Sequence, residues 1–341
     1  MKRIATTLAT SALALTALTA AAAAQETTLR VSNWLPPSHP IVKDIVQPWA
    51  EQVEEATEGR VEVQILDAPL GPPPAHFDLA ATGAADVTFG VHGYTPGRFA
   101  LTDIAELPFL TPSAEALSVG LWRLHENMLA EQNEHEGVKV LALWGHGPGH
   151  LFTTGGDVTP LDALEGAKVR VAGAVTNQLA EEMGMVPLQA PAPQTYELLS
   201  GGVADGIFFP YESIPFFKLD SIIEKGLRVP GGLYNVSFFF VMNEGTWNEL
   251  SEENKAAIDS VSGEPLVRMA GQAWDNADAA GLEAIRDTVE FHDATDAEME
   301  EIRAEAQAIY DAVREKVEAK GVDFDAALQM LQDETAKVAS E

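Results

Sequence analysis

Arg170 is the residue whose type and setting most clearly suggest chemistry with an anion. It lies in the segment 168–171, where Val169 and Val171 flank it in the alternating pattern of a β-strand. Alternation places the arginine on the face opposite the two valines, which we expect to face a core. A guanidinium is a planar fork of donors that fits a carboxylate through two parallel hydrogen bonds. The alternative is that Arg170 pairs with one of the chain's many acidic side chains.

Motifs for catalysis or cofactor binding are weak or missing. Residues 145–150 read GHGPGH, which invites comparison with a dinucleotide-binding loop. His150 stands in place of the third glycine and Pro148 removes a backbone N–H, so the fit is poor. His146 and His150 are four apart but not in a predicted helix, which argues against a metal site. Because HExxH and GxSxG are also missing, we expect no enzyme, no metal and no cofactor.

The elements around Arg170 form an α/β unit. Strands are predicted at 168–171, 186–188 and 205–209, and helices at 176–183 and 194–199 lie between them. Strands that alternate with helices in this way favour a parallel sheet.

An earlier segment repeats part of this unit. Residues 79–89 (LAATGAADVTF) and 198–208 (LLSGGVADGIF) both read helix end, glycine, Ala-Asp turn, strand and aromatic. The aspartate is most simply interpreted as a turn residue. The repeat suggests two similar lobes, each of which directs a strand end toward a shared cleft. Phe89 and Phe209 are then cleft candidates from opposite sides, unless they are core aromatics.

Composition narrows the possible partners. The chain has 341 residues, enough for two cores, and a formal net charge of −31. That charge argues against nucleic acid or an anionic membrane surface as partner. An anionic ligand would be repelled at long range, so local positive charge must capture it. The chain has no cysteine and therefore no disulfide.

The first 24 residues read as a cleavable secretory signal. Lys2 and Arg3 form a charged start, an Ala/Leu/Thr run follows, and Ala22-Ala23-Ala24 fits a small-residue cleavage site. We therefore expect export out of the cytoplasm. A membrane anchor is the alternative, but the apolar run is short and rich in alanine.

Three motifs resemble one family of receptors. They are Gly166-Ala-Lys-Val-Arg-Val, Met183-Gly-Met-Val-Pro, and Tyr196-Glu-Leu-Leu-Ser-Gly-Gly-Val-Ala-Asp-Gly. Together they resemble the DctP-type solute-binding proteins of TRAP transporters, and the resemblance extends from about Leu29 to the late helices. It implies an α/β, two-lobe periplasmic-binding-protein-like fold, with a ligand cleft between the lobes and a long helix that spans both. It also implies that Arg170 holds the carboxylate of an organic acid in that cleft.

The chain departs from the family pattern at positions that are expected to contact the ligand. Many members have Gln-Glu-Asn-Pro after the Asp-Gly, whereas this chain has Ile207-Phe-Phe-Pro, so that Phe209 replaces an asparagine that often assists the arginine. A second family arginine falls near Leu151. Fewer polar partners and more aromatics point to a small monocarboxylate with an apolar or aromatic body, such as an aromatic acid or a branched hydroxy or keto acid.

Loops and strand ends supply the other candidate ligand contacts. Trp34 and His39 follow the first strand, at the edge where α/β sheets bind ligands, although Trp34 could instead be a loop anchor. Tyr211 and Glu212 follow the strand that ends at Phe209 and could bind a ligand hydroxyl. The full set of candidates is Arg170, Phe209, Trp34, His39, Phe89, His92, Tyr94, His150, Tyr211, Glu212 and Phe238.

The predicted lobe boundaries follow the crossings between the two units. Lobe I is expected to comprise 25–148 plus 236–270, and lobe II 149–235 plus 271–341 with the C-terminal helices. Helices are predicted at 113–134 and over one long run at 251–287, and a strand at 222–223.

The function that the resemblance implies is that of a monomeric periplasmic receptor. It would bind a small organic acid, close its lobes, and deliver the acid to the small and large membrane subunits of a TRAP-type transporter. Two alternatives remain at the level of sequence. One is a sensor that presents the same acid to a signalling partner, and the other is an enzyme acting on a carboxylic acid.

Overall fold

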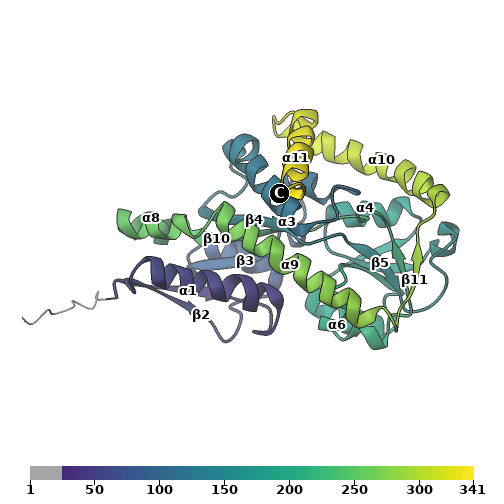
Figure 1. Ribbon diagram of the computed structural model, residues 1–341, viewed down its shortest axis with the longest axis horizontal. Coiled ribbons are helices and arrows are strands. Elements are labelled where there is room, and N and C mark those ends of the chain that lie inside the picture. Colours follow the sequence, from purple (N-terminus) through teal and green to yellow (C-terminus); the bar gives the residue numbers. More distant parts are fainter. Residues whose placement is uncertain (1–24) are drawn as a thin grey trace, which may run out of the picture.

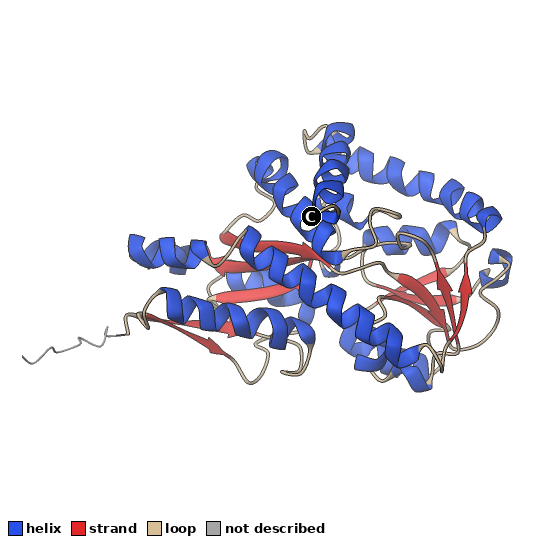
Figure 2. Ribbon diagram, in the orientation of Figure 1, coloured by secondary structure: helices blue, strands red, loops and turns tan. Residues whose placement is uncertain are grey.

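Two β-sheets, each covered by helices, form the two lobes of the molecule (Figures 1 and 2). The computed structural model describes residues 25–341. The predicted signal peptide, residues 1–24, lies outside the described residues. No helix within residues 25–341 is long and apolar enough to cross a membrane.

The first sheet has five strands in the order β2-β1-β3-β10-β4. Strand β1 pairs in parallel with β2 and β3, whereas β10 pairs antiparallel with β3 and β4. Helices cover both faces, which is why the apolar residues of β10 are all buried. The strands are β1 (Thr27–Ser32), β2 (Val61–Ile65), β3 (Val87–Val91), β4 (Val138–Gly145) and β10 (Ser237–Asn243).

The second sheet has six strands in the order β11-β9-β5-β8-β6-β7. Strand β6 carries Arg170 and pairs in parallel with β7 and β8, as the α/β pattern predicted. Strand β5 pairs antiparallel with β8 and β9. The strands are β5 (His150–Thr153), β6 (Lys168–Val171), β7 (Val186–Gln189), β8 (Gly206–Phe209), β9 (Lys225–Arg228) and β11 (Glu290–Asp293).

Eleven α-helices pack around the two sheets of residues 25–341 (Figure 2). They are α1 (Gln47–Ala56), α2 (His76–Ala81), α3 (Ala114–Leu124), α4 (Ala174–Glu182), α5 (Thr195–Ser200), α6 (Ser213–Phe216), α7 (Glu244–Glu249), α8 (Glu252–Ser260), α9 (Glu264–Ile285), α10 (Asp296–Ala319) and α11 (Phe324–Ala339).

Three predicted elements differ from those observed. The predicted strand at 222–223 is wrong, because the chain forms a turn there and the strand starts at Lys225. The predicted helix at 113–134 stays α-helical only to Leu124 and continues as a π-helix and a 3-10 turn. The run 251–287 is two helices, because Gly263 between them has φ of +61° and breaks the hydrogen-bond ladder.

The chain crosses between the sheets at two paired segments. Residues 146–149 lead from β4 to β5, and 229–236 lead from β9 back to β10. The segments meet in an antiparallel bridge between Gly149 and Tyr234. A Cβ on Gly149 would lie 2.1 Å from the Tyr234 ring, so only glycine allows this approach. The GHGPGH segment therefore forms one of the two connections between the sheets.

Helix α9 runs across both lobes (Figure 1). It meets the first lobe at Gly271, where a Cβ would lie 2.3 Å from Glu115 of α3. It meets the second lobe at Gly281, where a Cβ would lie 2.6 Å from the backbone of Glu212. Asp278 adds a hydrogen bond, since its carboxylate accepts the N–H of Glu212 at 2.9 Å. The helix is thus in direct backbone contact with both lobes.

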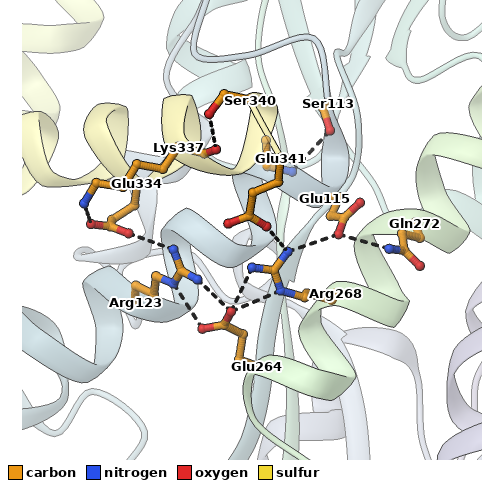
Figure 3. A network of polar contacts seen from close by, with 11 residues as sticks. Ser113, Glu115, Arg123, Glu264, Arg268, Gln272, Glu334, Lys337, Ser340 and Glu341 are labelled. Atoms are coloured by element: carbon orange, nitrogen blue, oxygen red, sulfur yellow. Dashed lines mark hydrogen bonds and ion pairs between the residues drawn. The ribbon is translucent and has the colours of Figure 1, made fainter.

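The C-terminal helices also connect the lobes. Helix α10 packs against α4 of the second lobe, and α11 packs on α3 of the first. A cluster of ion pairs joins α3, α9 and α11, with Arg123 bound to Glu264 at 2.7 Å and to Glu334 at 2.8 Å (Figure 3). Arg268 of α9 adds bonds to Glu264 and to the terminal Glu341. The lobe limits at 148/149 and 235/236 stay a prediction.

Candidate ligand-binding site

A cavity lies between the two sheets and is bordered by both lobes. Its volume is about 40 Å³, measured as the space that the centres of water molecules can occupy. Its residues are Trp34, Leu35, His39, Ile41, Val91, Tyr94, Phe238 and Trp274, with Arg170, Ala172, Ala192, Phe209, Pro210, Ser213 and Phe217 from the second-lobe segments, and His146, Tyr234 and Val236 from the two crossings.

Arg170 is the positive charge of this cavity. Val169 and Val171 are fully buried on either side of it, as the alternation predicted, and Arg170 itself is only 1% exposed. Its Nε donates to the carbonyl oxygen of Ala190 at 2.8 Å, and its guanidinium carbon lies 4.8 Å from the centre of the Phe209 ring. Within residues 25–341 no carboxylate lies within the 4.0 Å that defines an ion pair with it. The alternative of an acid-paired arginine is therefore wrong.

Tyr94 brings a first-lobe hydroxyl to the arginine. The residue lies in a short helical turn that directly follows β3. Its hydroxyl oxygen accepts the backbone N–H of Ala192 at 2.9 Å and faces Nη2 of Arg170 at 3.5 Å. Both partners belong to the second lobe, so these contacts cross the cleft. The hydroxyl proton is then free to be donated to an anion held by Arg170.

The two lobes touch directly beside Arg170. A Cβ on Gly93 would lie 2.8 Å from the Cα of Gly173 and 3.0 Å from the carbonyl oxygen of Ala172. The carbonyl of Gly93 also accepts a hydrogen bond from Gln189 Nε2 at 3.0 Å. On the second-lobe side, Thr176 fixes the loop because its hydroxyl oxygen accepts the N–H groups of Ala172 and Gly173. This is the closed arrangement of a two-lobe cleft.

Aromatic rings make a large part of the cavity wall. Phe209 stacks on Phe217 at 5.7 Å between ring centres, and Trp34 meets Tyr94 edge-on at 5.9 Å. A ligand ring could pack against aromatic side chains on both of its faces. Contacts between aromatic rings stabilise a complex by more than the burial of apolar area alone. The wall therefore suits a flat apolar body attached to the anionic group.

His39 and Glu212 form a buried polar pair across the lobes. His39 Nδ1 accepts the N–H of Ile41 at 3.1 Å, so the ring proton is on Nε2. Nε2 lies 3.7 Å from Glu212 Oε1, and burial lowers the pKa of His39 to about 3, so the contact is not an ion pair. Burial raises the pKa of Glu212 to about 7, partly offset by the hydroxyl of Ser213, which donates to Oε2 at 2.8 Å.

His146 lines the cavity and was not among the predicted contacts. Its Nδ1 donates to the carbonyl oxygen of Gly147, and its Nε2 makes no hydrogen bond within residues 25–341. Burial, with a contribution from the charge of Arg170, lowers the pKa of His146 to about 4. The sequence offered a signal for it, because the histidine directly follows the end of β4, but it was weighed only as a phosphate loop or metal ligand.

Six of the eleven predicted contacts border the cavity. They are Arg170, Phe209, Trp34, His39, Tyr94 and Phe238. Trp34 also anchors its loop, since its indole N–H donates to the carbonyl of Phe89 at 3.1 Å. The sequence missed His146, Ser213, Phe217, Tyr234 and Trp274, which come from a crossing, a short helix and the long helix.

The other five predicted contacts lie outside the cavity lining. Phe89 packs behind Trp34 in the core of the first lobe. His92 is fully enclosed and bonded to Ser237 and His135. His150 shares the sheet face of its partner Phe209 but packs on Tyr211 at 4.4 Å, and the Glu212 carboxylate accepts a hydrogen bond from Ser213. These five side chains make their contacts with other residues of the chain rather than with the cavity.

An open groove lies outside this cavity. Ala50 and Glu54 of α1 line its first-lobe side, and Tyr196 and Lys218 line its second-lobe side. Trp34, Leu35 and Phe217 border both the groove and the inner cavity. Tyr196 is 46% exposed there.

Comparison with known proteins identifies the class that this fold and cleft define. Residues 31–316 match the family described as bacterial extracellular solute-binding protein, family 7, or DctP. The chain belongs to this family, which consists of solute-binding receptors and not of enzymes. It is a TRAP-type solute-binding protein with the predicted two-lobe fold.

Three individual proteins are similar over most of the chain. A protein of Comamonas testosteroni, named outer membrane transporter protein TsaT, is 33% identical over 96% of this chain and 97% of its own length. A TRAP solute-binding protein of Bordetella bronchiseptica, solved with bound (R)- and (S)-mandelate, is 40% identical with a TM-score of 0.89, and covers 91% of this chain and 99% of that one. A marine metagenome protein specific for aromatic acids, solved with metahydroxyphenylacetate, is 30% identical with a TM-score of 0.85, and covers 92% and 99%.

Proposed function

We propose that this protein captures an aromatic monocarboxylate in the periplasm and delivers it to the membrane subunits of a TRAP transporter. The observation that carries the proposal is Arg170, a buried cation with no carboxylate partner within residues 25–341, set in an aromatic cavity between the lobes. Burying a charge is costly unless it is paired, so an anion from outside the chain is the expected partner.

The lining supports one carboxylate and an apolar body. Arg170 is the only lysine or arginine among the cavity residues of the described chain, so a second carboxylate would be buried without a counter-ion. The aromatic rings offer apolar surface in its place. Ligands of two similar proteins, mandelate and metahydroxyphenylacetate, have this composition.

The proposal includes a cycle of lobe closure without chemistry. The acid would bind to an open form, and closure at Gly93 and Gly173 would enclose it. We further propose that the protein acts as a monomer, that residues 1–24 direct it to the periplasm, and that it releases its acid unchanged.

A thermal-shift screen tests the proposed ligand class. Benzoate, phenylacetate, mandelate and 3-hydroxybenzoate should each be compared with succinate and glucuronate at equal concentration. A ligand at about 100 times its dissociation constant adds roughly 2.7 kcal/mol to the free energy of unfolding, so a true ligand should raise Tm visibly. We expect a rise with aromatic monocarboxylates only. A rise with succinate alone would contradict the proposal.

Phe209→Asn should weaken binding of the preferred aromatic acid. The ring packs against both Phe217 and the guanidinium of Arg170, and its removal takes apolar surface from the cavity wall. Loss of a buried phenyl costs about 1.5–3 kcal/mol, which corresponds to a ten- to hundredfold rise in Kd by isothermal titration calorimetry. Phe291→Asn, on the edge strand β11 of the same sheet and outside the cavity lining, is the matched control. Unchanged affinity in Phe209→Asn would make Phe209 a purely structural residue.

A further inference from the structure

The hydrogen-bonding groups of the cavity are unequally divided between donors and acceptors. Arg170 supplies guanidinium N–H groups and Tyr94 a hydroxyl proton. The buried indole N–H of Trp274 has no partner within residues 25–341. A carboxylate has only acceptor oxygens, so it can satisfy these donors.

His146 is the exception among these groups. A carbonyl oxygen can only accept a hydrogen bond, so the contact with Gly147 requires the proton of the ring to be on Nδ1. In the neutral ring Nε2 then carries a lone pair and can only accept. The ring is neutral at physiological pH, since burial and the nearby positive charge of Arg170 hold its pKa at about 4. No group of residues 25–341 donates to this nitrogen.

We propose that His146 Nε2 accepts a hydrogen bond from a hydroxyl of the ligand, so that the protein selects hydroxylated aromatic monocarboxylates over their deoxy analogues. The inference rests on the proposed function, because it concerns a second contact in the same cavity. A carboxylate cannot fill this role, since it has no proton to donate. In a complex with the deoxy acid, His146 Nε2 would be cut off from water without gaining a hydrogen-bond donor. This loss disfavours binding of the deoxy acid.

Binding of matched acid pairs to the unaltered protein is the primary test. Mandelate is compared with phenylacetate for a hydroxyl next to the carboxylate, and 3-hydroxybenzoate with benzoate for a hydroxyl on the ring. By isothermal titration calorimetry we expect one hydroxylated acid to bind about ten- to a hundredfold more tightly than its partner. Equal affinity within both pairs overturns the inference but leaves the proposed function standing. Failure of all four acids to bind overturns both.

Two variants assign the preference to His146. His146→Phe keeps a ring of similar size but removes the acceptor, so the preference for the hydroxylated acid should fall to about twofold or less. His146→Gln can place an amide oxygen near the position of Nε2 and should retain part of the preference. His292→Gln, a histidine on β11 bonded to Glu298 and outside the cavity lining, is the control and should match the unaltered protein. A full preference in folded His146→Phe overturns the assignment.

Proton uptake distinguishes two models for His146. In the proposed model its neutral ring accepts a hydrogen bond from a hydroxyl. In the alternative, ligand binding protonates His146, and the imidazolium donates to the carboxylate. Titration at pH 7 in two buffers of different ionisation enthalpy measures the protons taken up on binding. We expect no uptake that depends on His146. Uptake of about one proton that His146→Gln abolishes would overturn the inference.

Discussion

Arg170→Ala should weaken binding of the preferred acid by about 2–5 kcal/mol, the usual cost of truncating one side of a buried charge pair. The carboxylate would remain in an enclosed aromatic cavity with no cation among its lining residues. The contact with Tyr94 could not compensate, because one hydroxyl gives a single neutral hydrogen bond. Isothermal titration calorimetry measures the change, and thermal shift should show no ligand-induced rise.

Two further substitutions define what Arg170 contributes. Arg170→Lys should recover only part of the loss, since an ammonium cannot form two parallel bonds to one carboxylate. Arg228→Ala is the matched control, because this arginine of the second sheet pairs with Asp293 at 2.7 Å on the surface. That variant should bind normally. Full affinity in an Arg170→Ala protein with an unchanged circular dichroism spectrum would remove the central support for the proposed function.

Gly93→Ala should prevent full closure of the lobes. The new Cβ would lie 2.8 Å from the Cα of Gly173, and a backbone atom cannot turn aside as a side chain can. Overpacking of this kind costs about 1–3 kcal/mol, and the closed form alone would bear it, since the clash exists only where the lobes meet. The acid should therefore bind about ten- to a hundredfold less tightly.

Solution scattering measures the same defect directly. The unaltered protein should become more compact with saturating ligand, whereas Gly93→Ala should retain a larger radius of gyration. Gly71→Ala is the control, because its Cβ would meet the nearest side-chain atom at an ordinary 3.4 Å. If Gly93→Ala binds and contracts like the unaltered protein, the backbone contact between Gly93 and Gly173 does not limit closure.

The sequence allowed the fold and the position of Arg170 in the cavity to be predicted because both depend on local patterns. Alternation around Arg170 determined its face, and the strand–helix order around it determined a parallel arrangement. Phe209 could be predicted as a cleft residue because it ends the strand next to that of Arg170. These inferences need only the short-range periodicities of strands and helices.

The remaining contacts depend on how distant segments cross. Trp274 belongs to a helix with an ordinary amphipathic pattern, and nothing local distinguishes it from core residues of the same face. His150 and Tyr211 had the residue types of ligand contacts, but their rings pack on each other outside the cavity lining. His146 was visible in the sequence, yet its role depends on which ring nitrogen carries the proton. That follows from one contact with Gly147 and not from spacing.

The groove between α1 and the Tyr196 segment offers a way to observe this protein at work. Because the chain contains no cysteine, one thiol introduced at position 196 would be the sole attachment point for an environment-sensitive dye. The side chain is 46% exposed and faces a groove whose other wall belongs to the opposite lobe. Closure would change the polarity around the dye, so its emission should follow ligand concentration. The labelled protein would thereby become an optical sensor for the acid that it carries.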